Sequence, residues 1–170
     1  GIALQLKKQE AYGYFRILSD SKNVTQNKKV YEAVGSSRKL FITPNAVSSD
    51  TCEKLIDWAK EHASVHGGWT TSRHYAVPTN DIPLHTSTKL LAWFVDWFHE
   101  TATPLLQSQF QTKQKFFVHD AFLVRYSAGS SSDYLPLHYD ESTHSLVLAL
   151  NSDFEGGGTY FYSLHHISTP

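Results

Sequence analysis

The pattern of apolar and polar positions predicts two amphipathic helices in the first two thirds of the chain. Apolar residues recur every three or four positions over residues 52–63, which is the spacing of one helical face. Asp50, with Glu53 three positions later, is predicted to cap the start of this helix, and the glycines at 67 and 68 indicate its end. The second helix is expected to begin near Ser87 and to restart or kink at Pro104. The helix is expected to run through Leu90 and Leu91, and its aromatic stripe, Trp93, Phe94, Trp97 and Phe98, is expected in the core.

The last third of the chain reads as short strands separated by turns. Aromatic and β-branched residues predict a strand over residues 117–126, followed by a polar turn and by further strands over 145–150 and 154–161. Residues 135–143 are also expected to be extended, and three consecutive glycines at 156–158 indicate a tight bend or bulge. A patch at residues 12–18 is predicted to be an edge strand. Helices followed by several short strands predict an α+β, mainly β fold of jelly-roll type.

Composition narrows the class of protein. The 170 residues, 41% hydrophobic and 14% aromatic, are enough for a single domain with one core. We expect residues 1–115 to form an N-terminal helical support region and residues 116–170 a partial jelly-roll core. Fifteen basic and sixteen acidic residues give a net charge of −1, so a nucleic-acid partner is not expected. The apolar stretches are too short to span a bilayer, so we expect a soluble chain without a membrane partner.

One cysteine, Cys52, excludes an internal disulfide and any zinc site built from several thiolates of this chain. Its apolar neighbours on the predicted helix favour a buried, unreactive thiol. The lack of disulfides favours a reducing intracellular compartment.

His138 and Asp140 are the strongest candidates for chemistry. On a strand, residues two apart share a face, so the imidazole and the carboxylate would converge while Tyr139 points away. A His and a carboxylate are two of the three protein ligands of the facial triad that holds non-haem Fe(II) with coordination positions left open.

The region around this pair resembles the 2-oxoglutarate- and Fe(II)-dependent dioxygenases of the prolyl 4-hydroxylase and procollagen lysyl hydroxylase group. The matching motifs occur in the family's order and cover about the last third of the chain. They are Phe-Leu-Val-Arg-Tyr at 122–126, His-Tyr-Asp at 138–140 with Ser-Thr at 142–143, Ala-Leu-Asn at 149–151 and Asp-Phe-Glu-Gly-Gly-Gly-Thr-Tyr-Phe at 153–161.

The resemblance implies a double-stranded β-helix (jelly roll) supported by N-terminal helices, in one dioxygenase-like domain. It implies that His138 and Asp140 bind Fe(II) and that Tyr126 binds the co-substrate 2-oxoglutarate, although a Tyr that only packs is an alternative. Ascorbate is expected to keep the iron reduced. The expected substrate is a polypeptide, hydroxylated at proline or, as an alternative, at lysine. Ser142 and Thr143 are expected to orient Asp140 through hydrogen bonds.

The chain departs from the family pattern at its end. In the family, a distal His and a basic residue that pairs with 2-oxoglutarate lie beyond the Gly-rich segment, and this sequence stops at Pro170 before either. His165 and His166 follow that segment too soon and are predicted to be strand or turn residues. Because the sequence begins at Gly1 and contains no Met, we expect it to be part of a longer polypeptide.

The stretch from 69 to 85 has two interpretations. As a loop over the iron site, it would contact the peptide substrate through Trp69, Arg73, His74 and Tyr75. Alternatively, it is a strand followed by a proline-bounded loop that wraps the domain.

Two other functional classes stay open. Without a third ligand, the chain would be a non-catalytic jelly-roll binding module or an inactive relative. A zinc hydrolase is disfavoured because the sequence contains no His-Glu-x-x-His, and His62 and His66 are expected to lie on a solvated helix face. The sequence makes no prediction of oligomeric state.

Overall fold

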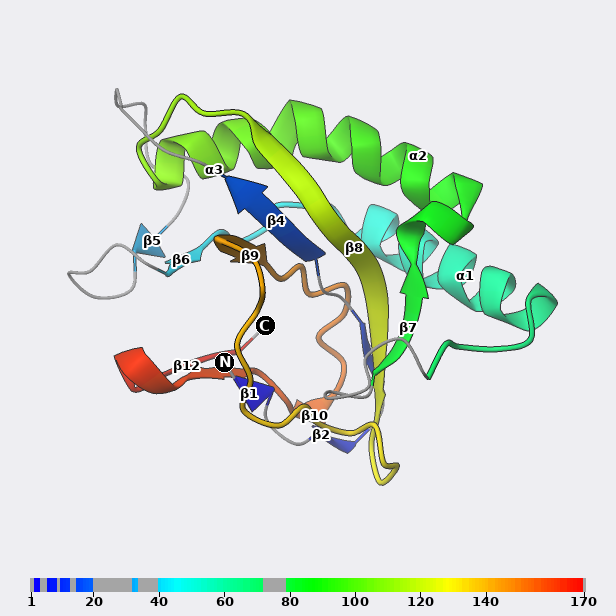
Figure 1. Cartoon of the computed structure of the whole chain (residues 1–170). Coiled ribbons are helices and arrows are strands. Elements are labelled where there is room, and N and C mark those ends of the chain that lie inside the picture. Colours follow the sequence, from blue (N-terminus) through cyan, green and yellow to red (C-terminus); the bar gives the residue numbers. More distant parts are fainter. Residues whose placement is uncertain are drawn as a thin grey trace.

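The computed structural model combines helices with antiparallel strands, and the helices cover one side of a curved sheet (Figure 1). It describes the backbone at 2–3, 6–8, 10–12, 15–19 and 32–33, and all of residues 40–71 and 79–169. The described helices are α1 (Ser49–Val65), η1 (Leu84–Thr86), α2 (Thr88–Trp97), η2 (Phe98–Ala102), α3 (Thr103–Gln109) and η3 (Tyr162–Leu164). The described strands are β1 (Ile2–Ala3), β2 (Leu6–Lys8), β3 (Glu10–Tyr12), β4 (Phe15–Ser19), β5 (Glu32–Ala33), β6 (Phe41–Ile42), β7 (Asn80–Pro83), β8 (Phe116–Ser127), β9 (His144–Leu146), β10 (Glu155–Gly156), β11 (Thr159–Phe161) and β12 (His166–Ser168).

Helix α1 confirms the predicted spacing but begins at a different cap. Its N-cap is Ser48, whose hydroxyl accepts a hydrogen bond from the Thr51 N–H at 3.4 Å, so the prediction that Asp50 caps the helix is wrong. Asp50 lies in the first turn instead, where a negative charge is favourable next to the helix dipole. Gly67 and Gly68 end the helix with positive φ angles of 84° and 107°. Its buried positions are Cys52, Leu55, Ile56, Ala59 and Ala63.

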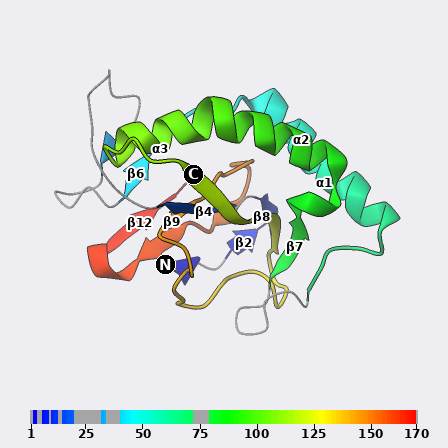
Figure 2. The ribbon, with the colours of Figure 1, turned by 45° about the horizontal axis from the view of Figure 1, so that its top comes forward.

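The second predicted helix is a continuous rod made of α2, η2 and α3 (Figure 2). The rod begins next to Ser87, as predicted, and the Ser87 hydroxyl caps it by accepting a hydrogen bond from the Leu90 N–H at 3.5 Å. Pro104, which has no N–H to donate, lies at the start of α3. The preceding turn, η2, is a π-helix that ends with the Thr103 N–H donating to the Phe98 carbonyl. Proline thus alters the helix at the predicted position without stopping it.

Strand β8 is the centre of the largest sheet. Along one edge it pairs with β3 through Glu10–Tyr12 and then with β4 through Phe15–Ser19, and β4 also pairs with β9. On the other edge it pairs with β7, in the register Asn80 to Arg125 and Pro83 to Phe122. Strand β4 therefore lies inside the sheet, and the prediction of an edge strand in this region is wrong.

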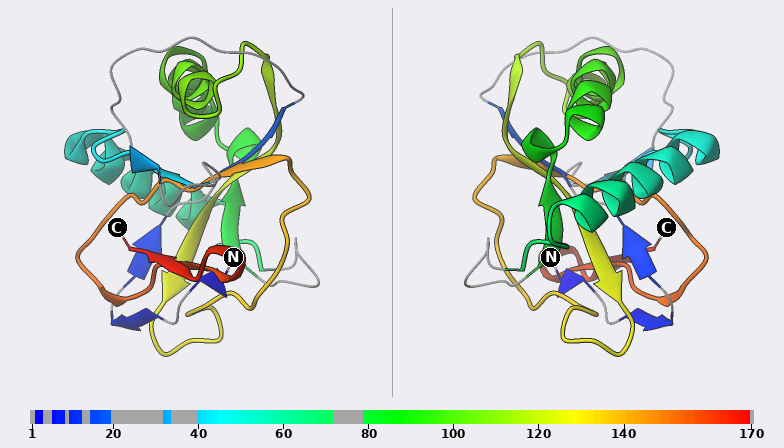
Figure 3. Two further views of the ribbon diagram at one scale, coloured as in Figure 1. Left: turned by 90° about the vertical axis from the view of Figure 1, so that its left-hand side faces the viewer. Right: turned by 90° about the vertical axis from the view of Figure 1, so that its right-hand side faces the viewer.

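Two small antiparallel sheets lie on the side away from the helices (Figure 3), and a third, made of β5 and β6, lies beside α3 (Figure 1). Strands β1, β11 and β12 form one sheet, and β10 pairs with β2. The predicted bulge occurs at Glu155 and Gly156, where the register with β2 shifts. Gly158 has a φ of 95°, and a Cβ there would lie 2.7 Å from the Ser168 carbonyl oxygen, so glycine permits the close approach of β11 and β12.

The largest core lies between the helices and the sheet. Both faces of the middle of β8 are covered, since Phe122, Leu123 and Val124 are each buried. Leu123 belongs to the helix-side core, which contains α1 and α2 residues including Phe94 and Trp97, so the predicted aromatic stripe is in the core. Cys52 is buried there too, as expected.

The described strands do not decide whether the fold is a double-stranded β-helix, and that assignment stays a prediction. Within the described residues, no helix combines the length and the apolar character needed to cross a membrane.

Candidate functional site

His138 and Asp140 lie in an irregular segment that leads from the end of β8 back to β9 (Figure 3). The prediction that they lie on a strand is wrong. Pro136 contributes no N–H for ladder pairing, and regular pairing with β4 begins only at His144. The two side chains nevertheless converge, with 3.4 Å between His138 Nε2 and Asp140 Oδ1. Tyr139 between them is 97% exposed, so it points away from the pair as predicted, although the segment is not a strand.

A backbone carbonyl fixes the proton on the His138 ring. Nδ1 lies 2.8 Å from the Pro136 oxygen. Because a carbonyl oxygen only accepts hydrogen bonds, Nδ1 must carry the hydrogen, and Nε2 of the neutral ring then presents a lone pair. That lone pair faces the Asp140 carboxylate, which also only accepts. The facing atoms therefore need a proton or a metal cation between them.

Asp140 is held from its other side by serines. Ser145 Oγ donates a short hydrogen bond to Asp140 Oδ2, and the Ser142 hydroxyl lies 2.9 Å from Ser145 Oγ. Since Ser145 uses its hydrogen on the carboxylate, Ser142 is the donor to Ser145. The prediction that Ser142 orients Asp140 directly is thus corrected to an indirect action through Ser145. The Thr143 hydroxyl lies 3.2 Å from His144 Nδ1.

Electrostatics around the pair follow from these contacts. The hydrogen bond to Asp140 raises the pKa of His138 above its ordinary value, although burial acts in the opposite direction. Both side chains are about one fifth exposed, at 19% and 20%, so solvent and ions reach them. A proton and a metal cation would compete for the same Nε2 lone pair.

The pair fits two ligands of a divalent metal. Metal bonds of about 2.1 Å at right angles place two ligand atoms about 3.0 Å apart, close to the 3.4 Å between Nε2 and Oδ1. Metal-binding histidines almost always donate their other ring N–H to a carboxylate, a backbone carbonyl or water, as Nδ1 does here, and ligating carboxylates accept further hydrogen bonds, as Asp140 does. Across 40–71 and 79–169, no third His, Cys, Asp or Glu completes a three-residue cluster.

His144 lies near the pair in sequence but serves the core. Its ring centroid lies 4.3 Å from that of Phe110 and 5.6 Å from that of Phe116, both edge-on. Burial lowers the pKa of His144 and so favours the neutral, packed ring.

The predicted co-substrate residue Tyr126 lies half-buried near the end of β8. Strand alternation places it on the same face as Val124, away from the helix-side core that contains Leu123. Its backbone pairs with Ala11 of β3. Its role toward 2-oxoglutarate stays a prediction.

Trp69 is half-buried against the helix-side core, and the Arg125 guanidinium lies 4.8 Å from its ring centroid, a cation–π arrangement. Thr70 forms a bridge with Asp81, and β7 follows, so the second part of this stretch is a strand. Arg73, His74 and Tyr75 lie outside the described residues. A contact between these four residues and a substrate stays a prediction.

The structure thus brings together His138 and Asp140, as predicted, and adds Ser145, which the sequence analysis missed. His165 and His166 lie in a turn and in β12, as predicted. The resemblance to a dioxygenase family rests on the quoted motifs. A comparison of this chain with models of protein families, with curated proteins and with solved structures finds no match.

Proposed function

We propose that this chain is an Fe(II)- and 2-oxoglutarate-dependent dioxygenase that hydroxylates a peptidyl residue, with proline as the favoured substrate and lysine as the alternative. The observation that carries the proposal is the 3.4 Å approach of His138 Nε2 to Asp140 Oδ1, with His138 Nδ1 hydrogen-bonded to the Pro136 carbonyl. When the His138 ring is neutral, its Nε2 and the Asp140 carboxylate are two hydrogen-bond acceptors that face each other. Each side chain is oriented by a hydrogen bond on its far side, from Nδ1 to the Pro136 carbonyl and from Ser145 to Asp140, as metal ligands commonly are.

In this proposal, each residue of the site has a separate task. His138 and Asp140 hold the iron, the Pro136 carbonyl keeps the hydrogen on Nδ1, and Ser145 fixes the orientation of the carboxylate. Tyr126 contacts the carboxylate of 2-oxoglutarate. When bound, Fe(II) with 2-oxoglutarate supplies the activation of O2 for C–H hydroxylation, and ascorbate keeps the iron reduced.

A second candidate is a non-catalytic binding module. It is favoured by one observation, namely that the described residues contain no third metal ligand beside His138 and Asp140. Two protein ligands hold a metal more weakly than three, because each additional ligand contributes to the binding free energy.

Two measurements separate these functions. The first is anaerobic calorimetric titration with Fe(II), in which we expect binding that is lost in His138→Ala and kept in the matched control His66→Ala, an exposed histidine that follows α1 as its C-cap. The second is succinate formation from 2-oxoglutarate in air, with a proline-rich or a lysine-containing peptide and with ascorbate. Iron binding without succinate formation would support the binding module. Iron binding that does not depend on His138 would contradict the assignment of His138 and Asp140 as metal ligands.

A further inference from the structure

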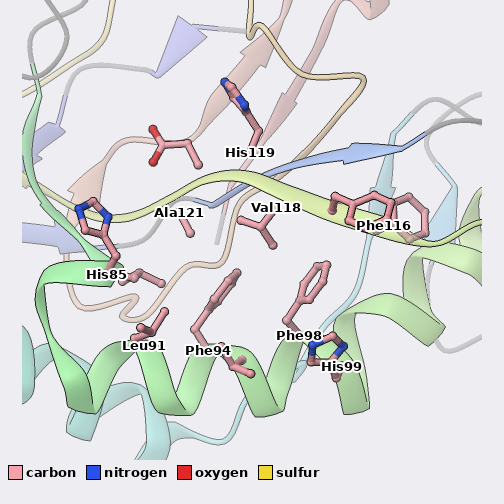
Figure 4. Close-up of a pocket in the computed structure, with 13 residues that line it drawn as sticks. His85, Leu91, Phe94, Phe98, His99, Phe116, Val118, His119 and Ala121 are labelled. Carbon is pink, nitrogen blue, oxygen red and sulfur yellow. The ribbon is translucent and has the colours of Figure 1, made fainter.

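We draw no further inference here: the strongest candidate, the apolar pocket between the α2–η2 part of the helical rod and the first half of β8 (Figure 4), carries none because nothing in the described part of the chain shows what covers it.

Discussion

Replacing Leu55 with alanine tests whether α1 supports the sheet as the structure indicates. Leu55 is 1% exposed and lies in the core shared by α1, α2 and β8. The change removes three carbon groups, which contribute about 2.4 kcal/mol at about 0.8 kcal/mol each. The cavity left behind adds roughly 1 to 2 kcal/mol. We therefore expect the free energy of unfolding to fall by about 3.4 to 4.4 kcal/mol.

The assay is urea unfolding followed by tryptophan fluorescence, which reports on this core because Trp58, Trp93 and Trp97 all pack in or against it. The matched control is Val65→Ala at the end of α1, where the side chain is 73% exposed and a change below about 0.5 kcal/mol is expected. A loss of less than about 1 kcal/mol for Leu55→Ala, with an unchanged dependence on urea, would refute the packing of α1 against the sheet.

Three further predictions concern the site and the C-terminal strands. Asp140→Asn should lower the pKa of His138, measured by NMR titration, because the hydrogen bond to Asp140 is the largest cause that raises it. Because its pKa is raised in the folded state, protonated His138 stabilises the wild type fully at pH values below the unfolded pKa near 6.5. This contribution to the free energy of unfolding disappears as the pH rises through the folded pKa, and the pH dependence should flatten in Asp140→Asn. Ser145→Ala should weaken Fe(II) binding by about tenfold or more in calorimetry, and an unchanged affinity would exclude an orienting role. Gly158→Ala should lower the free energy of unfolding in urea by roughly 2 to 4 kcal/mol, and the control Gly129→Ala by about 1 kcal/mol. Both glycines have a positive φ, but only at position 158 would the added Cβ meet a backbone oxygen. Equal losses would contradict the close approach of β11 and β12.

Local signals predicted the helices well because their information lies within a few residues. The spacing of Leu55, Ala59 and Ala63 specifies a helical face regardless of the rest of the chain. The start of α1 was harder, since Ser48, Ser49 and Asp50 are all residues of a capping type. Only the geometry of the surrounding chain decides which of them caps the helix.

The site was predicted in part, and for a reason that proved incorrect. The convergence of His138 and Asp140 was deduced from strand alternation, but an irregular segment next to Pro136 produces it. Ser145 was missed because its contact with Asp140 depends on β9, which is positioned by pairing with β4, more than a hundred residues earlier. No pattern within the motif carries that information.

The hydrogen bond from His138 Nδ1 goes to a peptide carbonyl rather than to a side chain. Every amino acid supplies a main-chain oxygen, so substitution at position 136 can alter the path of the backbone but cannot delete the acceptor itself. The choice of tautomer is therefore insulated from point mutation, whereas the carboxylate opposite depends on a serine hydroxyl that one codon change removes. Of the two side chains in the pair, the imidazole therefore has the orienting hydrogen bond that is less easily lost by a point substitution.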